Sequence, residues 1–391
     1  MNHLLALTGQ SAAAIDTPAL VVDLDVMERN LAAMAAFAQK HQVKLRPHAK
    51  MHKSAELALL QIQHGACGVC VQKTSEAEAL VAAGVHNIFI TNEVISQAKL
   101  MRVAALTRAV AVAAKAGKIA LCVDSIEGIN RLAASMNQAR GSSGMATEID
   151  VFIEINVGQQ RCGVAPGAPA VALALEIRKH PALNFAGLQA YHGKAQHMRS
   201  PSDRRAAITQ ATDAAALTRQ LIEAQGIKVG LITGAGTGTA ALEAASGVYG
   251  ELQAGSYLFM DADYAANQPD PAQPRFAQAL FVKTQVISTH SDYVVCDAGH
   301  KSHAIDSGLP KVHAFSARSK LTYFNGGDEH GILRPKAGST RLPALGSMLW
   351  LIPGHCDPTV NLYQEMIGVR GGLLKGLVER IITVDARGAL T

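Results

Sequence analysis

The sequence is poor in aromatic residues and has no basic run, and both shortages argue against nucleic-acid binding. Aromatic side chains make up only 4% of the 391 residues, which disfavours surfaces that stack bases. The net charge of +5 comes from 36 basic and 31 acidic residues spread along the chain. Such a small, dispersed excess gives no reason to expect a nucleic-acid partner.

Cysteine is also scarce, and long apolar runs are missing. Six cysteines in a chain of this length do not form a disulfide framework. Cys67 and Cys70 lie in a strand-like run, where residues three apart face opposite sides, so a redox or zinc pair is not expected. No apolar stretch is long enough to span a bilayer, and the first residues do not read as a signal peptide. We therefore expect a soluble, cytoplasmic protein with reduced cysteines.

Short apolar runs alternate with helical stretches through the first two-thirds of the chain. Helical periodicity is found in residues 54–64, 75–83, 96–115 and 203–224. The strand-like runs are 44–50, 68–72, 87–92, 119–125, 149–156, 185–193, 230–236 and 251–260. Apolar strands separated by helices indicate a parallel sheet covered on both faces. The pattern predicts an α/β protein with a (β/α)₈ TIM barrel over residues 28–270. An open doubly wound sheet is the alternative.

The character of the chain changes after Phe276, where helical patterns stop. Strand-like runs follow at 279–287, 293–297, 347–352 and 380–384, separated by Gly, Pro and Asp. An opening strand at 19–24 precedes the first barrel strand. We expect residues 1–27 and 271–391 to form a second, mostly β domain, which is consistent with a length comfortable for two domains.

Lys50 closes the first predicted barrel strand, shortly after Arg46 and His48. Active sites of barrels lie at the C-terminal ends of the strands. Other predicted strand ends are polar as well, at residues 72–73, 91–93, 154–161 and 189–197. These ends together predict a polar pocket, in which a partly desolvated lysine with a lowered pKa can form a Schiff base. The alternative for Lys50 is an ordinary surface lysine at a strand end.

A glycine-rich turn, TGAGTGT at residues 233–239, follows the seventh predicted strand and precedes a helix. Glycines allow backbone amides to approach an anion, and a helix N-terminus favours negative charge. Thr239 stands where the dinucleotide-binding fingerprint needs glycine, so a small phosphate cradle is the better interpretation. The alternative is a tight turn without a ligand. A second Gly-Ser turn at residues 253–257 follows the eighth strand, and barrel phosphate sites commonly use these two loops.

The segment PGHCDP at residues 353–358 carries a possible metal pair. On an extended segment, residues two apart face the same side, so His355 and Asp357 can reach one ion while Cys356 points away. One imidazole and one carboxylate suit Mn²⁺ or Mg²⁺ with exchangeable positions better than a closed structural zinc site. Chance spacing of the two residues is the alternative.

These pieces together resemble the D-threonine aldolase family of pyridoxal-phosphate enzymes and its relatives, the D-3-hydroxyaspartate aldolases. The resemblance covers nearly the whole chain. Its motifs are RPHAKMHK at 46–53, QKTSEA at 72–77, TNEV at 91–94, RCGV at 161–164, GLQAYHG at 187–193 with QH at 196–197, ELQAGSY at 251–257, DEHG at 328–331 and PGHCDPT at 353–359. The resemblance implies an alanine-racemase-like fold, a homodimer, pyridoxal 5'-phosphate and a divalent metal, with Mn²⁺ expected and Mg²⁺ or another ion as the alternative.

The same resemblance implies roles for individual residues. Lys50 is the Schiff-base lysine, and His197 is the base on the substrate hydroxyl. His355 and Asp357 bind the metal. Arg161 and Tyr191 line the cofactor ring. The cofactor phosphate is held by Gly234, Gly236, Thr237, Ser256 and Tyr257. The histidines His48, His192 and His330 are interpreted as positioning groups, with His192 or metal-bound hydroxide as alternatives for the base.

The implied reaction is retro-aldol cleavage of a D-β-hydroxy-α-amino acid to glycine and an aldehyde. Asp357 stands where the related dehydratases carry cysteine, which favours an aldolase. Met51 and His48 point to different branches, so the β-substituent, threonine-like or hydroxyaspartate-like, stays open. Ala235 replaces a usual glycine and is tolerable if its φ is negative. The rivals are a D-serine or hydroxyaspartate dehydratase, a racemase, and a non-catalytic carrier of the cofactor.

Overall fold

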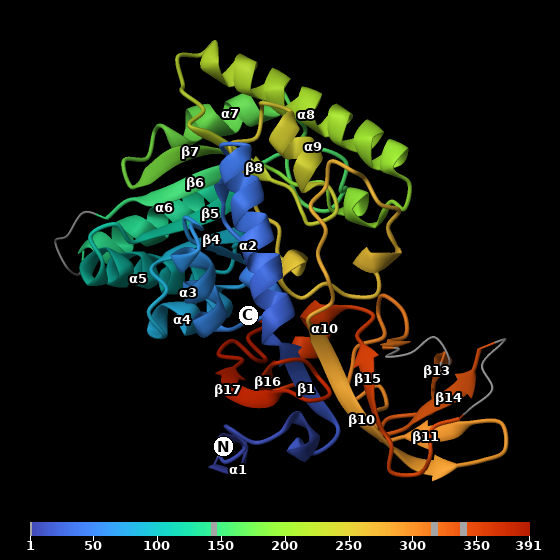
Figure 1. Cartoon of the computed structure of the whole chain (residues 1–391). Helices are drawn as coiled ribbons and strands as arrows, with labels where there is room; N and C mark the ends of the chain where they lie inside the picture. The colour runs from blue at the N-terminus through green and yellow to red at the C-terminus, as the bar shows by residue number, and fades with distance from the viewer. Residues whose placement is uncertain (1, 142–146, 314–319, 337–341) are drawn as a thin grey trace.

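Two β-sheets organise the protein, one in a barrel and one in a separate β domain (Figure 1). The computed structural model describes residues 2–141, 147–313, 320–336 and 342–391. None of the helices in this part of the chain combines the length and apolar character needed to cross a bilayer.

The barrel sheet consists of eight parallel strands, and each overlaps a run expected from the sequence. They are β2 (Lys44–Leu45), β3 (Val69–Val71), β4 (Asn87–Glu93), β5 (Lys118–Val123), β6 (Ile149–Glu154), β7 (Leu183–Ala190), β8 (Leu231–Gly234) and β9 (Glu251–Leu252). The order β2-β9-β8-β7-β6-β5-β4-β3 brings β2 and β3 to the two ends of the sheet. A bridge between His48 and Cys70 joins these ends, and the Cys70 N–H donates to Pro47 O at 2.8 Å. The (β/α)₈ prediction is therefore confirmed.

Helices cover the outside of the barrel. They are α2 (Leu24–Lys40), α3 (Ala55–Gln63), α4 (Thr74–Ala82), α5 (Gln97–Ala113), α6 (Ile126–Gly141), α7 (Ala168–Ile177), α8 (Pro201–Glu223) and α9 (Ala240–Ala245). Local chemistry sets their starts: the Asp23 carboxylate accepts from the Val26 N–H at the beginning of α2, and Pro201 begins α8. Between strands and helices lies an apolar core rich in Val, Ile, Leu and Ala, which explains why the strands are uninterrupted apolar runs.

The second sheet has nine strands. They are β1 (Ala19–Asp23), β10 (Leu280–Thr289), β11 (Val294–Cys296), β12 (Lys311–Val312), β13 (Leu321–Asn325), β14 (Gly331–Pro335), β15 (Met348–Ile352), β16 (Glu365–Arg370) and β17 (Leu377–Thr383). The opening strand β1 pairs antiparallel with β10 and parallel with β16, so it joins this sheet as expected. The sequence did not predict β12, β13, β14 and β16. Strand β12 is short, β13 and β14 contain exposed residues, and β16 has the charged residues Glu365 and Arg370 at its ends.

The expectation that helices stop after Phe276 is wrong at one important place. Cys356–Val360 forms a short helix, α10, and His355 stands immediately before it with extended dihedral angles (φ −143°, ψ 128°). Asp357 and Pro358 lie in the first turn, where a carboxylate is favoured and a missing N–H costs nothing. The segment is therefore not extended through Asp357.

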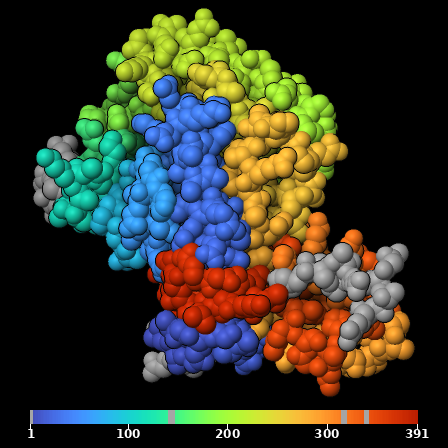
Figure 2. All heavy atoms as spheres, viewed as in Figure 1, coloured from blue at the N-terminus to red at the C-terminus, as the bar shows by residue number. Residues whose placement is uncertain are grey.

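Helix α10 connects the β domain to the barrel, because it packs against the short 3₁₀ turn η2 (Ala49–Met51) that carries Lys50. The strands β16 and β17 lie directly below the barrel helices, with the N-terminal residues beneath them (Figure 2). Further short elements are α1 (Asn2–Leu5), η1 (Ala12–Ala14), η3 (Gly193–His197), η4 (Ser256–Leu258) and η5 (Tyr264–Ala266). The junction of the two sheets thus places parts of both around one cavity.

Candidate active site

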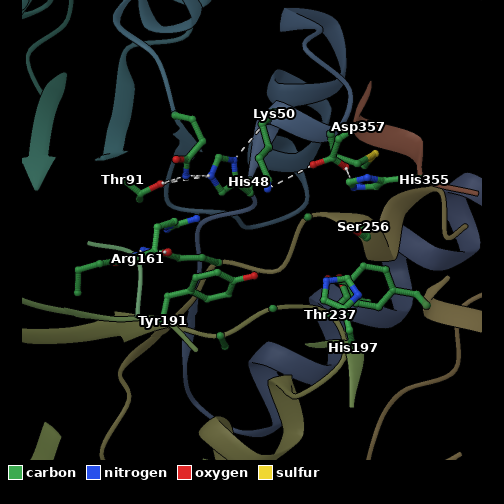
Figure 3. A pocket seen from close by; sticks show the side chains of 18 residues that line it. His48, Lys50, Thr91, Arg161, Tyr191, His197, Thr237, Ser256, His355 and Asp357 are labelled. Carbon is green, nitrogen blue, oxygen red and sulfur yellow. Dashed lines mark hydrogen bonds and ion pairs between the residues drawn. The ribbon is translucent and has the colours of Figure 1, made fainter. Parts of the chain in front are cut away.

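A cavity opens at the C-terminal ends of the barrel strands, where α10 approaches (Figure 3). Most residues that the sequence singled out lie on its wall. The lining residues are His48, Lys50, Met51, Gln72, Thr91, Arg161, Gln189, Tyr191, His197, Ala235, Gly236, Thr237, Gln253, Gly255, Ser256, Tyr264, His355 and Asp357. The cavity therefore lies at the end of the barrel where the active sites of (β/α)₈ enzymes are found.

Lys50 belongs to the turn η2 rather than to the end of a strand, and its side chain is 42% exposed. Its Nζ atom lies 3.4 Å from Asp357 Oδ2. Burial lowers the pKa of Lys50, but the nearby Asp357 carboxylate, with Tyr191, outweighs burial and raises it. The expectation of a lowered pKa is therefore wrong for this arrangement of side chains. The reason is Asp357, which tertiary packing brings to the amine.

His48 is held between the backbone of η2 and the barrel strands. Its Nδ1 accepts from the Lys50 N–H at 3.3 Å, and its Nε2 lies 2.8 Å from Gln72 Nε2 and 3.2 Å from Thr91 Oγ1. Burial and then the positive charges of Lys50 and Arg161 hold the pKa of His48 well below its usual range. The ring is therefore neutral, and its contacts fix the turn that carries Lys50.

Arg161 and Tyr191 lie together on one side of the cavity, across from His355 and Asp357 (Figure 3). Arg161 Nη2 is 4.0 Å from Glu154 Oε1, at the end of β6. Burial, followed by a neighbouring carboxyl group, raises the pKa of Glu154, while Arg161 opposes this effect. A guanidinium backed by a buried carboxyl group can donate hydrogen bonds to a ring nitrogen without losing its proton.

The glycine-rich turn after β8 forms another wall of the cavity. Among the described residues, the backbone N–H groups of Gly236, Thr237 and Ser256 have no protein acceptor. The Thr237 hydroxyl oxygen accepts from the Tyr257 N–H at 2.9 Å, so its hydrogen is available to a ligand. Ala235 has φ +69°, so the condition of a negative φ is not met and its backbone is strained. Free donors at a cavity wall suit an anion such as phosphate.

Two predicted phosphate residues, Gly234 and Tyr257, do not line the cavity. The Tyr257 side chain is fully buried, and its hydroxyl accepts from Gln61 Nε2 at 3.0 Å on the side of the helices. Gly234 packs against the strand β7, because a Cβ atom there would lie 2.4 Å from Ala190 O. Both residues therefore pack beneath the glycine-rich turn, and neither faces the cavity.

A buried network supports the glycine-rich turn. The Gly238 N–H donates to Gln196 Oε1 at 3.0 Å, and Gln196 Nε2 donates to Thr239 Oγ1 at 2.8 Å. Thr239 in turn donates to Glu243 Oε1 at 2.8 Å, while the second carboxyl oxygen of Glu243 has no hydrogen-bond partner among the described residues. Burial raises the pKa of Glu243 to about 7.

His355 and Asp357 come together although the local geometry differs from the one expected. His355 Nε2 lies 3.6 Å from Asp357 Oδ1, and that oxygen is buried without a hydrogen-bond donor in the described chain. His355 Nδ1 lies 2.8 Å from Asp306 Oδ2, a residue that sequence reasoning missed. With Nδ1 engaged, Nε2 is the atom available to a ligand. Within the described residues, no group of three or more His, Cys, Asp or Glu side chains is placed to hold a metal ion.

His197 ends η3 and is half-exposed at the cavity. Its Nδ1 lies 2.5 Å from Asp263 Oδ2, and Arg199 forms an ion pair with the other oxygen of Asp263. Sequence reasoning missed Asp263, since 66 residues separate it from His197. The available signal was its position three residues after the predicted strand-like run 251–260.

The remaining histidines do not line the cavity. His192 is buried against Gly158, whose added Cβ atom would lie 2.4 Å from His192 Nε2. His330 is exposed immediately before β14. His197 is therefore better placed than His192 to meet a substrate.

Comparisons with known proteins identify the family of the chain. Residues 22–263 match the family described as "Alanine racemase, N-terminal domain", and residues 279–369 match "Putative serine dehydratase domain". The chain is 46% identical to a D-threonine aldolase of Arthrobacter sp, over 97% of this chain and 95% of that protein. It is 39% identical to a 3-hydroxy-D-aspartate aldolase of Paracoccus denitrificans, over 98% and 95%.

Comparison with solved structures identifies the same family. The crystal structure of D-threonine aldolase from Filomicrobium marinum matches with a TM-score of 0.91 and 44% identity, covering 98% of this chain and 99% of that one. D-threo-3-hydroxyaspartate dehydratase from Delftia sp. shares the fold, with a TM-score of 0.80 and 24% identity over 95% and 98% of the two chains. The resemblance inferred from the motifs is confirmed, and the chain belongs to the alanine-racemase-like family that contains the D-threonine aldolases and 3-hydroxy-D-aspartate aldolases.

Proposed function

We propose that this protein is a pyridoxal-phosphate- and divalent-metal-dependent aldolase that cleaves D-β-hydroxy-α-amino acids to glycine and an aldehyde. One observation carries the proposal: an amine, a histidine–carboxylate pair and a second histidine line one cavity, and a carboxylate outside the cavity supports the second histidine. They are Lys50, His355 with Asp357, and His197 with Asp263. A D-threonine aldolase that is 46% identical over nearly the whole chain supports the same reaction.

The cavity wall fits pyridoxal phosphate. Lys50 Nζ provides the amine for covalent attachment, and Arg161 and Tyr191 flank the space for the ring. The free N–H groups of Gly236, Thr237 and Ser256 provide phosphate donors, as an anion requires. When bound, the cofactor supplies an electron sink for the carbon–carbon bond that breaks.

The donor set of His355 and Asp357 fits a divalent ion with open positions. One imidazole nitrogen of His355 and one carboxylate oxygen of Asp357 face the same space. That oxygen accepts no hydrogen bond from the described residues. We propose Mn²⁺, with Mg²⁺ as the alternative, because two protein ligands leave most positions to exchangeable groups. Such an ion supplies Lewis acidity at the substrate hydroxyl.

His197 removes the proton of the substrate β-hydroxyl in this scheme. Its Nδ1 faces Asp263, so the other ring nitrogen is left for the substrate. General base catalysis of this kind contributes about 10²–10⁴-fold to the rate. Met51 and His48 also line the cavity.

A second candidate substrate is D-3-hydroxyaspartate, with glyoxylate as the aldehyde. The 39% identity to a 3-hydroxy-D-aspartate aldolase favours it. A dehydratase is the further alternative, and a relative named D-threo-3-hydroxyaspartate dehydratase is 27% identical over 88% of this chain and 92% of that protein. We further propose a cytoplasmic homodimer, with a barrel of residues 28–270 and a β domain of residues 1–27 and 271–391.

Product analysis tests the proposal. Purified, cofactor-loaded protein with added Mn²⁺ is given D-threonine, L-threonine and D-3-hydroxyaspartate in parallel. Glycine from the D-substrates only, abolished by a chelator, is the expected result, and the relative rates identify the side chain. Ammonia with a keto acid would instead identify a dehydratase, and full cleavage without metal would overturn the metal role.

A further inference from the structure

Asp263 lies behind His197 in a geometry that restricts the imidazole to one arrangement of its hydrogen. His197 ends η3 after β7, whereas Asp263 immediately precedes η5, between β9 and β10. The Asp263 side chain is only 10% exposed, and the His197 side chain is 51% exposed. One end of the ring therefore meets a buried carboxylate, and the rest of the ring lies at the cavity.

The carboxylate itself is held in place by Arg199. The guanidinium pairs with Asp263 Oδ1, while Arg199 Nη1 donates to Asp263 O and to Asn267 Oδ1, each at 2.7 Å. The Asp263 N–H also donates to Gly354 O at 3.3 Å. Burial raises the pKa of Asp263, but Arg199 and His197 outweigh it and lower the pKa. Asp263 is thus an ionised group that can only accept hydrogen bonds.

We propose that Asp263, oriented by Arg199, is a positioning residue that keeps a hydrogen on Nδ1 of His197 and leaves Nε2 free to act as the base. The proposal rests on the proposed function for the role of the base. Since a carboxylate only accepts, the ring nitrogen 2.5 Å from it must be the donor. In a neutral imidazole the other nitrogen then carries the lone pair. Asp263 does not line the cavity, so it acts through His197.

Arg199 makes the effect of an isosteric substitution predictable. A guanidinium can only donate, so in Asp263→Asn it takes the amide oxygen as its acceptor. The amide nitrogen then faces His197 and donates to Nδ1. This forces the ring hydrogen onto Nε2, which can no longer accept a proton. The expected loss is about 10²–10⁴-fold in kcat, with little change in KM.

Removing Arg199 from the Asp263→Asn protein distinguishes a positioning role of Asp263 from a purely structural one. Without the guanidinium, the introduced amide of the double variant Asp263→Asn/Arg199→Met can rotate and offer its oxygen to His197. The double variant should therefore be at least about 10-fold more active than Asp263→Asn alone, whereas Arg199→Met in the otherwise native chain should lose activity. If Asp263 only stabilised the fold, the two losses would add and the double variant would be the weakest.

The tautomer of His197 can be read directly by ¹⁵N NMR of histidine-labelled, cofactor-loaded protein, with His197→Gln identifying the resonance. The hydrogen is expected on Nδ1 in the native chain, on Nε2 in Asp263→Asn and again on Nδ1 in the double variant. A native ring with its hydrogen on Nε2, a fully active Asp263→Asn protein or a double variant weaker than Asp263→Asn would each overturn the inference. If these tautomers are found but no β-hydroxy amino acid is cleaved, the proposed function fails while the positioning role stands.

Discussion

The buried carboxyl group of Glu243 should make stability depend on pH in a way that one substitution removes. Glu243 lies in α9 behind the glycine-rich turn, with one oxygen bonded to Thr239 and the other without a partner among the described residues. Burial raises its pKa from the ordinary value of 4.5 to about 7. Between these two pH values the folded state binds more protons than the unfolded state, so stability falls as pH rises.

The size of the effect follows from the interval between the two pKa values. At about 1.4 kcal/mol per pH unit, the interval from 4.5 to about 7 amounts to about 3 kcal/mol. Glu243→Gln keeps the shape and the acceptor for Thr239 but cannot ionise. The variant should therefore match the native chain below pH 4.5 and exceed it in free energy of unfolding by about 3 kcal/mol at pH 8.

Urea unfolding of the native chain and of Glu243→Gln at several pH values from 4.5 to 8 measures this difference. Glu223→Gln, at an exposed position of α8, is the matched control and should show no comparable change with pH. A constant difference between Glu243→Gln and the native chain across the range would refute the reasoning. Destabilisation by Glu243→Gln at pH 8 would do so more directly, because it would mean that the ionised carboxylate is well solvated.

Substitutions at three positions, Ala235, Lys50 and Asp306, test separate parts of the site. Ala235→Gly should raise the free energy of unfolding by up to about 1 kcal/mol, because φ +69° is strained for alanine; Ala235→Val should lower it in the same urea titration. Borohydride reduction of the cofactor-loaded protein should label the peptide that contains Lys50; the label should vanish in Lys50→Ala and persist in the exposed control Lys194→Ala. Asp306→Asn should weaken Mn²⁺ binding about 10–100-fold in a titration of free ion, since Asp306 orients His355; unchanged affinity would remove Asp306 from the metal site.

The sequence alone determined the architecture of the barrel and many of the chemical groups in the cavity. Apolar runs and helical periodicity are local properties, and each of the eight predicted strands overlaps an observed one. Lys50 and the pair His355 and Asp357 were identified from residue type, position and motif, and all three line the cavity. The strands β13 and β14 escaped detection because half-exposed strands with polar residues have a weak local pattern.

Tertiary structure decided how those groups act. It raised the pKa of Lys50 by bringing Asp357 to 3.4 Å, and it turned Tyr257 into the core. It also supplied Asp263 to His197 and Asp306 to His355, partners that are 66 and 49 residues away along the chain. The residue type determines which chemistry a side chain can perform. The pKa, tautomer and orientation of that side chain depend on neighbours from other elements. The packing of α10 against η2 brings Asp357 to Lys50, and the folding of distant loops onto one another brings Asp263 to His197 and Asp306 to His355.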